Sequence, residues 1–358
     1  MREKKIKVKE ILDKAYNKHH FTKDEIKFLL NSEGEEKELL FAYADRVRKE
    51  YVGDDVYLRG LIEFSSYCKN DCFYCGLRRS NREAQRYRMQ EDEIVEVAKR
   101  AYDMGYRTVV LQSGEDPYYT KDRVYSIIKK IKKEVDVAIT LSIGERSYEE
   151  YKAFREAGAD RYLMRFETSN RELYQKYHPG MSFENRIECL RWIKSLGYEL
   201  GTGFLIGLPG QTIDDLANDI LLVYELDSDM IGIGPFIPHP HTPLKDTEAG
   251  SVDLTLKCIS ILRLLMPDSN IPATTALGTL DPLGRQKGLK CGANIVMPNV
   301  NDLKYKLKYE LYPGKICINE DATKCRGCIE SIIISLGRKV GQGFGQSRHY
   351  ELKKAVYN

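Results

Sequence analysis

The sequence has no long apolar run and no excess of charge of one sign. Its 358 residues include 56 Lys and Arg against 53 Asp and Glu, which gives a net charge of +3. This balance favours neither a nucleic acid nor an acidic membrane surface as a partner. No apolar stretch follows the charged first seven residues, so we expect neither a signal peptide nor a membrane span. Low-complexity segments and interdomain linkers are also lacking.

The nine cysteines do not have the pattern of a disulfide framework. Six of them fall in two groups: Cys68, Cys72 and Cys75, and then Cys317, Cys325 and Cys328. In a chain of this size, grouped cysteines fit a reducing compartment and metal–sulfur binding. We therefore expect a cytoplasmic protein.

The first group has the spacing C-x3-C-x2-C, with Tyr74 just before the last cysteine. Thiolates this close on one loop suit an iron–sulfur cluster. Three cysteines leave one iron of a four-iron cluster open for a ligand, as on other catalytic metals. A zinc site or free buried thiols are the alternative, although zinc normally takes a fourth protein ligand and no histidine lies near this loop. The motif resembles that of the radical S-adenosylmethionine (SAM) superfamily.

After an N-terminal helical region, short β-branched runs alternate with amphipathic stretches, as is typical of βα units. Eight strands are predicted, near residues 57–64, 108–113, 136–143, 160–167, 199–206, 230–236, 271–276 and 292–297. Predicted helices between them include Glu91–Met104, Lys121–Lys133, Phe183–Leu196 and Asp214–Tyr224. Eight repeats predict an α/β fold, a closed (β/α)8 TIM-type barrel over residues 51–300. Helices over 1–50 would cap it, and a C-terminal extension over 301–358 would end in a flexible glycine-rich segment, 341–346.

Charged residues recur on one side of two predicted strands. Alternation groups Arg59 with Glu63 in the first strand, and Arg161 with Arg165 and Glu167 in the fourth. Because the outer face of a barrel strand packs on helices, these residues should point inward. Unpaired buried charge is costly, so they predict a hydrated or ligand-filled chamber whose arginines suit carboxylates and other anions. Ion pairing among them at the barrel rim is the alternative, and the two interpretations are compatible.

The segments that follow the strands lie at the end of a barrel where active sites are found. Gln112–Tyr118 follows the second strand and resembles the motif with which radical SAM proteins hold the amino group of SAM. Gln112, Ser113 and Glu115 offer acceptors there, although a plain turn would use the same residue types. Further candidates for SAM contacts are Tyr74, Thr140, Ser142, Arg165, Glu167, Arg186, Ile206 and Leu208.

The remaining signals are weaker. The second cysteine group, C-x7-C-x2-C, predicts either a second iron–sulfur site or a zinc site or free thiols. His239 and His241 lie among prolines, and we interpret their loop as rigid rather than metal-binding. Side chains that would wall the chamber, with ordinary packing as the alternative, are Thr274, Thr275, Tyr309 and Tyr312.

Several segments carry a narrower resemblance, which extends over about residues 35–340. They are Cys68–Asn81, Leu111–Tyr118, Gly158–Arg165, Gly207–Asp215, Ile231–His239, Pro272–Ala276 and Cys291–Asn294. Together they resemble the HydE family, the radical SAM maturases of FeFe-hydrogenase. Biotin synthase and methylornithine synthase are similar but more distant.

This resemblance implies that Cys68, Cys72 and Cys75 hold a 4Fe–4S cluster whose open iron chelates SAM. It implies reductive cleavage of SAM to a 5′-deoxyadenosyl radical, with an electron from an external donor of the flavodoxin or ferredoxin type. The implied substrate is a small molecule, a cysteine-bound iron carbonyl–cyanide unit delivered by the maturase HydG, and the product passes to the di-iron subcluster assembled on HydF. The C-terminal cysteines match a second cluster that some members lack. The implied substrate cavity is lined by Arg59, Arg161, Thr274, Thr275, Tyr309 and Tyr312.

Two other functions stay open at this point. One is a radical SAM mutase or synthase acting on a small amino acid, similar to methylornithine synthase. The other is a non-catalytic iron–sulfur carrier, which would bind a cluster without cleaving SAM.

Overall fold

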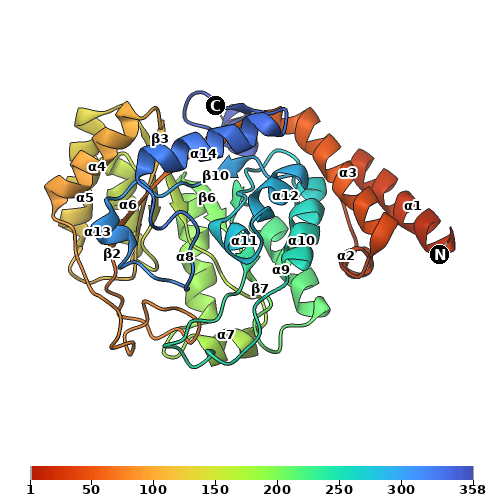
Figure 1. Ribbon diagram of the computed structural model, residues 1–358, viewed down its shortest axis with the longest axis horizontal. Helices are drawn as coiled ribbons and strands as arrows, with labels where there is room; N and C mark the ends of the chain where they lie inside the picture. The colour runs from red at the N-terminus through yellow and green to blue at the C-terminus, as the bar shows by residue number, and fades with distance from the viewer. Residues whose placement is uncertain (1, 358) are drawn as a thin grey trace.

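The chain folds around a parallel β-sheet that helices enclose (Figure 1). The computed structural model describes residues 2–357. Three helices precede the sheet: α1 (Arg2–Lys18), α2 (Lys23–Leu30) and α3 (Gly34–Val52). At the start of α2, the side chains of Thr22 and Glu25 each accept a hydrogen bond from the other's backbone N–H, which caps the helix. Both α2 and α3 pack against α10 (Val252–Leu265), so the N-terminal helices are docked on the rest of the chain.

Six strands form one parallel sheet in the order β2-β3-β4-β5-β6-β8. They are β2 (Gly60–Ser65), β3 (Thr108–Ser113), β4 (Ala138–Ser142), β5 (Arg161–Leu163), β6 (Glu199–Thr202) and β8 (Met230–Ile231). A second parallel sheet has the order β10-β1-β11, formed by β1 (Asp55–Leu58), β10 (Ile295–Val296) and β11 (Lys339–Val340). The short strands β7 (Leu205–Ile206) and β9 (Gly234–Pro235) pair with each other. The α/β class and the parallel strands predicted from the sequence are confirmed.

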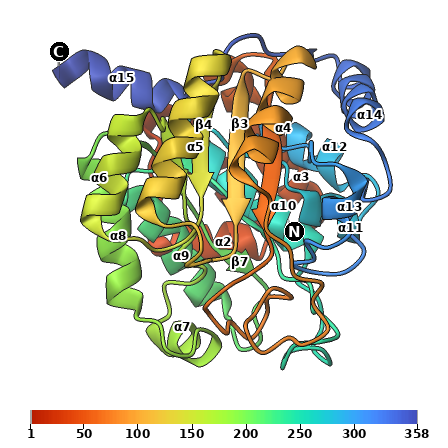
Figure 2. The ribbon, with the colours of Figure 1, turned by 90° about the vertical axis from the view of Figure 1, so that its left-hand side faces the viewer.

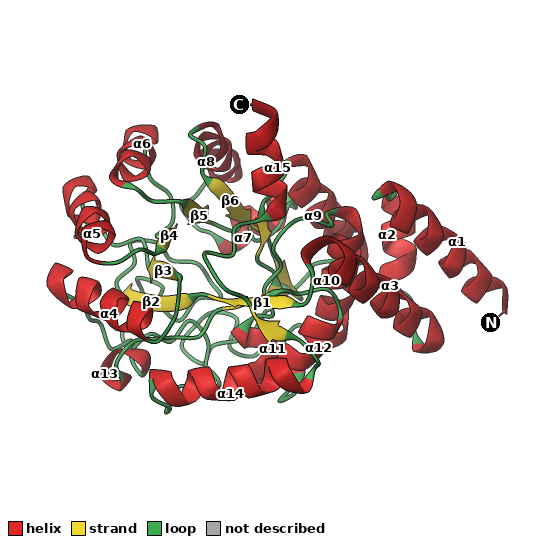
Figure 3. Cartoon of the chain, turned by 90° about the horizontal axis from the view of Figure 1, so that it is seen from above, coloured by secondary structure: helices red, strands yellow, loops and turns green. Residues whose placement is uncertain are grey.

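Helices follow most of the strands and surround the sheet, as the view from above shows (Figure 3). The four helices predicted between strands are present, each within two residues of its predicted ends. These are α4 (Glu91–Asp103), α5 (Lys121–Glu134), α8 (Phe183–Ser195) and α9 (Ile213–Glu225). The others are α6 (Tyr148–Ala157), α7 (Arg171–Tyr177), α11 (Thr275–Leu280), α12 (Gly284–Lys290), α13 (Leu303–Lys306), α14 (Ala322–Ser335) and α15 (Arg348–Tyr357). Among residues 2–357, none of these helices combines the length and apolar character that crossing a bilayer requires.

Isolated parallel bridges extend the pairing beyond the six-stranded sheet. They join Met230 to Asn270, Pro272 to Ile295 and Leu61 to Asn299. The prediction of a regular seventh strand near 271–276 is therefore wrong. Pro272 has no backbone N–H to donate, and α11 already begins at Thr275. The predicted first strand is divided into β1 and β2 at Arg59.

A buried ion cluster lies at the N-terminal ends of the strands, opposite the ends from which the long loops leave. Arg161 donates from Nε to Glu199 Oε2 at 2.6 Å, and Arg59 Nη2 lies 3.6 Å from Glu199 Oε1. All three side chains are at most 2 % exposed. The prediction that Arg59 and Arg161 line a substrate cavity is thus corrected, because both are held at the opposite end of the sheet.

The glycine-rich segment 341–346, predicted to be a flexible end, covers this cluster. The carbonyl oxygen of Phe344 accepts hydrogen bonds from Thr108 Oγ1 and from Arg161 Nη2, and the carbonyl oxygen of Gly345 accepts one from Arg59 Nη2. A Cβ atom added to Gly345 would meet the Tyr57 ring at 2.5 Å, so a larger residue there would clash. We call residues 341–347 the floor segment.

Candidate active site

The loop between β2 and α4, residues 66–90, carries the three grouped cysteines at the C-terminal end of the sheet. Figure 2 shows this loop below the tips of β3 and β4. Backbone bonds tie it to other loops: Lys69 N–H donates to Glu115 O at 2.9 Å, and Phe73 N–H donates to Tyr177 O at 3.0 Å. The Arg86 guanidinium donates to the carbonyl oxygens of four loop residues, Ser66, Leu77, Arg78 and Asn81. A loop without regular structure is thereby held in one shape.

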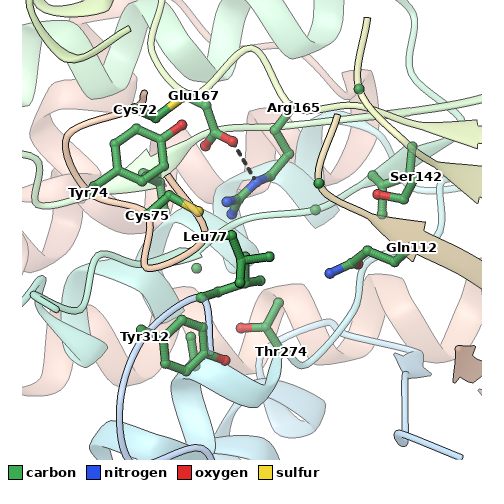
Figure 4. A pocket seen from close by; sticks show the side chains of 18 of the residues that line it. Cys72, Tyr74, Cys75, Leu77, Gln112, Ser142, Arg165, Glu167, Thr274 and Tyr312 are labelled. Carbon is green, nitrogen blue, oxygen red and sulfur yellow. Dashed lines mark ion pairs between the residues drawn. The ribbon is translucent and has the colours of Figure 1, made fainter. Parts of the chain in front are cut away.

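All three cysteines line one cavity of about 380 Å³. Most of the residues predicted to hold SAM or substrate line the same cavity: Tyr74, Gln112, Ser113, Glu115, Ser142, Arg165, Glu167, Arg186, Thr274, Thr275, Tyr309 and Tyr312. Figure 4 shows Cys72 and Cys75 on one side of it and Gln112 and Ser142 on the other, with Arg165 between them in this view. The structure therefore collects side chains from seven separate stretches of the chain around one space.

The surroundings of the three thiols favour the binding of a metal ion. Burial raises the pKa of the Cys75 thiol to about 12 and also raises the pKa of Cys68. Burial, and then the proximity of Cys75 and Cys68, raises the pKa of Cys72 well above its ordinary value. A bound metal cation stabilises thiolates that are otherwise disfavoured in this way. Three half-buried cysteines on one cavity wall therefore fit an iron–sulfur cluster with an open iron.

Charged groups line the same cavity as the thiols, among them Arg165, Glu167 and Arg186. Arg165 Nε lies 3.2 Å from Glu167 Oε1, and Arg186 Nε donates to Glu145 Oε1 at 2.7 Å. The Oε2 atoms of Glu115 and Glu167 are buried without a hydrogen-bond partner among the described residues. Glu167 also has a φ of 69°, a left-handed conformation that costs a non-glycine residue free energy and is concentrated at functional sites. The Lys69 ammonium lies 3.4 Å from Glu115 Oε2, beyond the described hydrogen bonds. Buried carboxylate oxygens without a hydrogen bond, beside a guanidinium, suit a zwitterionic ligand with an ammonium group.

Three residues predicted to contact SAM do not line this cavity. Thr140 is fully buried beneath it, and its Oγ1 has no partner among residues 2–357. Ile206 and Leu208 are also buried, whereas their neighbour Leu205 reaches the cavity wall. Leu208 belongs instead to a small apolar cluster on which Tyr74 packs.

The wall residues that were not predicted from the sequence include His178 and Lys315. His178 accepts a hydrogen bond from the Tyr74 hydroxyl at its Nε2 (2.8 Å) and donates from Nδ1 to Tyr174 O (2.8 Å). Burial, and then the Arg186 charge, lowers the pKa of His178 to about 3, so the imidazole is neutral and orients Tyr74. Lys315 donates to the buried carboxylate of Glu63 at 2.8 Å and to Tyr309 O at 3.0 Å.

The second cysteine group is only partly gathered. Ligand atoms of Cys317, Glu320 and Cys325 lie within 4.8 Å of one another. Cys328, one turn further along α14, is exposed and does not belong to that set. His239, in the proline loop, is buried and lies 3.4 Å from the Glu310 carboxylate, on the outer side of Gly76.

A parallel sheet with a cluster-type cysteine loop at the C-terminal ends of its strands defines a radical SAM protein. Residues 62–223 match the family described as "Radical SAM superfamily". The chain is 53 % identical over 339 residues to the [FeFe] hydrogenase maturase subunit HydE of Thermotoga maritima, which covers 94 % of this chain and 97 % of that protein. It therefore belongs to the HydE family of radical SAM enzymes.

More distant relatives agree with this assignment. The 3-methylornithine synthase of Methanosarcina barkeri is 36 % identical over 287 residues, which are 79 % of this chain and 81 % of that protein. The crystal structure of methylornithine synthase (PylB) superposes with a TM-score of 0.84 at 30 % identity, covering 97 % of this chain and 99 % of that one. The maturase HydG from Carboxydothermus hydrogenoformans has the same fold, with a TM-score of 0.78 at 22 % identity over 94 % of this chain and 80 % of that one. The radical SAM family implies a 4Fe–4S cluster and SAM as cofactors.

Proposed function

We propose that this protein cleaves SAM reductively and acts in assembly of the di-iron subcluster of FeFe-hydrogenase, on a cysteine-bound iron carbonyl–cyanide precursor. The observation that carries the proposal is the convergence of three loop thiols with Arg165 and Glu167 on one cavity of about 380 Å³. Identity of 53 % to a HydE maturase supports the biological role. We further interpret the bridges at Asn270, Pro272 and Asn299 as the pairings that complete an eight-stranded barrel over residues 51–300.

In this proposal Cys68, Cys72 and Cys75 hold the cluster. The SAM ligand is bound by Tyr74, Gln112, Ser113, Glu115, Ser142, Arg165, Glu167 and Arg186. When bound, the two cofactors supply one-electron cleavage of a sulfonium bond to methionine and a 5′-deoxyadenosyl radical. The acceptors Glu115 and Glu167 bind the ammonium group, and Arg165 binds the carboxylate. Apolar wall residues such as Leu77, Met164 and Phe236 exclude water.

The substrate would lie against the side chains supplied by the C-terminal third of the chain, namely Thr274, Thr275, Tyr309 and Tyr312. Lys315, which pairs with Glu63 at 2.8 Å, brings a cationic group to this half of the cavity, and such a group suits an anionic, thiolate-bearing iron complex. We propose HydG as the source of that complex, HydF as the acceptor of the product, and an external one-electron donor of flavodoxin or ferredoxin type. The protein would work in the cytoplasm.

A second candidate is a mutase or synthase that acts on a small amino acid. The similarity to methylornithine synthase, with a TM-score of 0.84, favours this alternative over an iron–sulfur carrier. We also retain a second metal–sulfur site, formed by Cys317 and Cys325 with Glu320 close to them and Cys328 exposed nearby.

Anaerobic reconstitution tests the proposal. The dithionite-reduced protein should convert SAM to 5′-deoxyadenosine, and its paramagnetic resonance spectrum should change when SAM is added. Cys72→Ala should abolish both, whereas Cys258→Ala, at a buried cysteine of α10 outside the cavity, should retain both. Deoxyadenosine yield that rises with the iron complex supports the maturase role, and a rise with lysine instead supports the mutase. Equal behaviour of Cys72→Ala and the parent protein contradicts the enzyme assignment.

A further inference from the structure

The cysteine loop has an uneven charge. Residues 66–90 contain six Lys and Arg but only two acidic residues, so this segment carries more positive charge than the net +3 of the whole chain. The rest of the protein is therefore close to neutral. The concentration of cationic charge around the metal-binding thiols calls for an explanation beyond binding the thiolates.

Three of these cations hold the loop in shape, through contacts within it or with Asp116 after β3. Arg78 pairs with Asp71 at 2.5 Å, Arg88 pairs with Asp116 at 2.7 Å, and Arg86 binds backbone carbonyl oxygens. These three arginines hold the loop in shape, and their guanidinium groups already have partners. The remaining three, Lys69, Arg79 and Arg82, are exposed.

The exposed cations lie on one stretch of surface beside the thiols. Lys69 is adjacent to Cys68, and the Arg79 N–H donates to Asn70 O at 2.8 Å, which brings Arg79 next to Lys69. The Arg86 guanidinium binds both Ser66 O and Asn81 O, so the residues that follow these two, Tyr67 and Arg82, are drawn together. Neither Arg79 nor Arg82 has an ion-pair partner within residues 2–357. We call Tyr67, Lys69, Arg79 and Arg82 the cluster-loop surface.

An aromatic residue stands among these charges. Tyr67 is 37 % exposed, directly precedes Cys68 and is fixed by the Arg88 guanidinium 3.9 Å from its ring centroid. Exposed tyrosine with arginine is the composition typical of protein interfaces. A fixed aromatic side chain beside Arg79 and Arg82, which have no ion-pair partner among the described residues, therefore suits the docking of an acidic protein.

We propose that the cluster-loop surface docks an acidic one-electron carrier protein. This proposal rests on the proposed function, because a cluster that cleaves SAM must be reduced from outside. The three thiols belong to the loop itself, so a donor that docks on this loop contacts the segment that supplies the metal ligands. The reduced carrier loses one electron, the metal centre on Cys68, Cys72 and Cys75 gains it, and no proton or atom is transferred. Electron-transfer complexes are small and transient, and they depend on charge to speed the encounter.

The test compares two reductants: flavodoxin, which must dock on the protein, and dithionite, a small molecule that does not need a docking surface. Arg79→Glu with Arg82→Glu reverses two charges of the surface, and Lys69 is left unchanged because its ammonium lies 3.4 Å from Glu115 in the SAM pocket. The matched control reverses two exposed lysines on distant helices, Lys9→Glu in α1 and Lys152→Glu in α6. With subsaturating reduced flavodoxin at low ionic strength, the Arg79/Arg82 variant should form 5′-deoxyadenosine at least about tenfold more slowly than the parent. With dithionite the same variant, and with either reductant the control, should stay within about twofold of the parent.

Two further measurements complete the design. Arg79→Gln with Arg82→Gln should have an intermediate effect, and the parent's flavodoxin-driven rate should fall as salt is raised because ions screen the attraction. Equal slowing of the surface and control variants, or a parent rate independent of salt, overturns the docking surface. If reversal impairs the dithionite reaction through misfolding, the Gln pair and the salt series decide the question alone. Failure of the parent to cleave SAM with dithionite contradicts the proposed function instead, while flavodoxin binding measured by titration calorimetry still tests the surface.

Discussion

The buried ion cluster beneath the sheet predicts a large and specific loss of stability when its one carboxylate is neutralised. Glu199 faces both Arg59 and Arg161, and no side chain of the three is more than 2 % exposed. In Glu199→Gln the shape and most hydrogen bonds are kept, but two buried guanidinium groups lose their countercharge. Burial, and then the Arg161 charge, already lowers the pKa of Arg59 to about 9, which shows how little solvation this site provides.

The expected cost follows from breaking a buried pair, about 3–5 kcal/mol. Unfolding entropy near the midpoint is about 2.1 cal/mol/K per residue, or about 0.75 kcal/mol/K for 358 residues. The midpoint of thermal unfolding should therefore fall by about 4–7 °C. Circular dichroism of anaerobically purified protein measures this shift.

The control is the same substitution at an exposed pair. Glu188 lies 3.8 Å from Arg191, with 47 % and 69 % of their side chains exposed, and such pairs contribute about 0–1 kcal/mol. Glu188→Gln should therefore move the midpoint by no more than about 1 °C. Equal midpoints for the two variants would refute the view that Glu199 neutralises the cluster.

Three other outcomes are expected. Gly76→Ala should lower both stability and SAM cleavage, because its Cβ would lie 2.1 Å from the Glu310 carbonyl oxygen. Gly327→Ala, in an open helical position, should instead stabilise the protein by about 0.5–1 kcal/mol. The two substitutions should therefore shift the midpoint of thermal unfolding in opposite directions. His178 has a folded pKa of about 3 against an ordinary value of 6.5, so its contribution to stability is full above pH 6.5 and is lost as the pH falls toward 3. The midpoint of the parent should consequently fall more steeply between pH 6.5 and 5 than that of His178→Gln, and parallel curves would contradict the assignment. Truncating the chain after Val340 should destabilise the protein by removing the acceptors of Arg59 and Arg161, and an unchanged midpoint would show that the floor segment is dispensable.

The residues closest to the thiols could be predicted from the sequence because their positions depend on short distances along the chain. Spacing places Cys68, Cys72 and Cys75 on one loop, and the ends of parallel strands place Gln112 and Ser142 beside it. The first deduction needs only the spacing of the cysteines, and the second needs only the positions of the strand ends. The cavity lining agrees with them.

Side-chain alternation could not predict how far along a strand each residue lies from the cavity. Parity correctly turned Arg59 and Arg161 inward, but each lies four residues before the inward charge that reaches the cavity, Glu63 or Arg165. Four residues of strand span about 13 Å, enough to separate the floor of the sheet from its mouth. Parity gives the direction of a side chain and not its height.

Residues contributed by distant loops gave no signal in the sequence. His178 meets Tyr74 across 104 positions and Lys315 meets Glu63 across 252, and neither has a spacing motif or a strand end to mark it. The seventh strand failed for a local reason, since Pro272 interrupts backbone donation there. The contacts of His178 and Lys315, by contrast, are fixed by tertiary packing alone.

The floor segment also has a consequence for how the protein is made. Domains begin to fold from the N-terminus during synthesis, at about 5–20 residues per second. The carbonyl groups that receive Arg59 and Arg161 belong to residues 344 and 345, which leave the ribosome after every strand of the six-stranded sheet. Until then both arginines must stay hydrated, so water reaches the N-terminal ends of the strands in the nascent sheet. The floor segment excludes this water only when translation is almost complete.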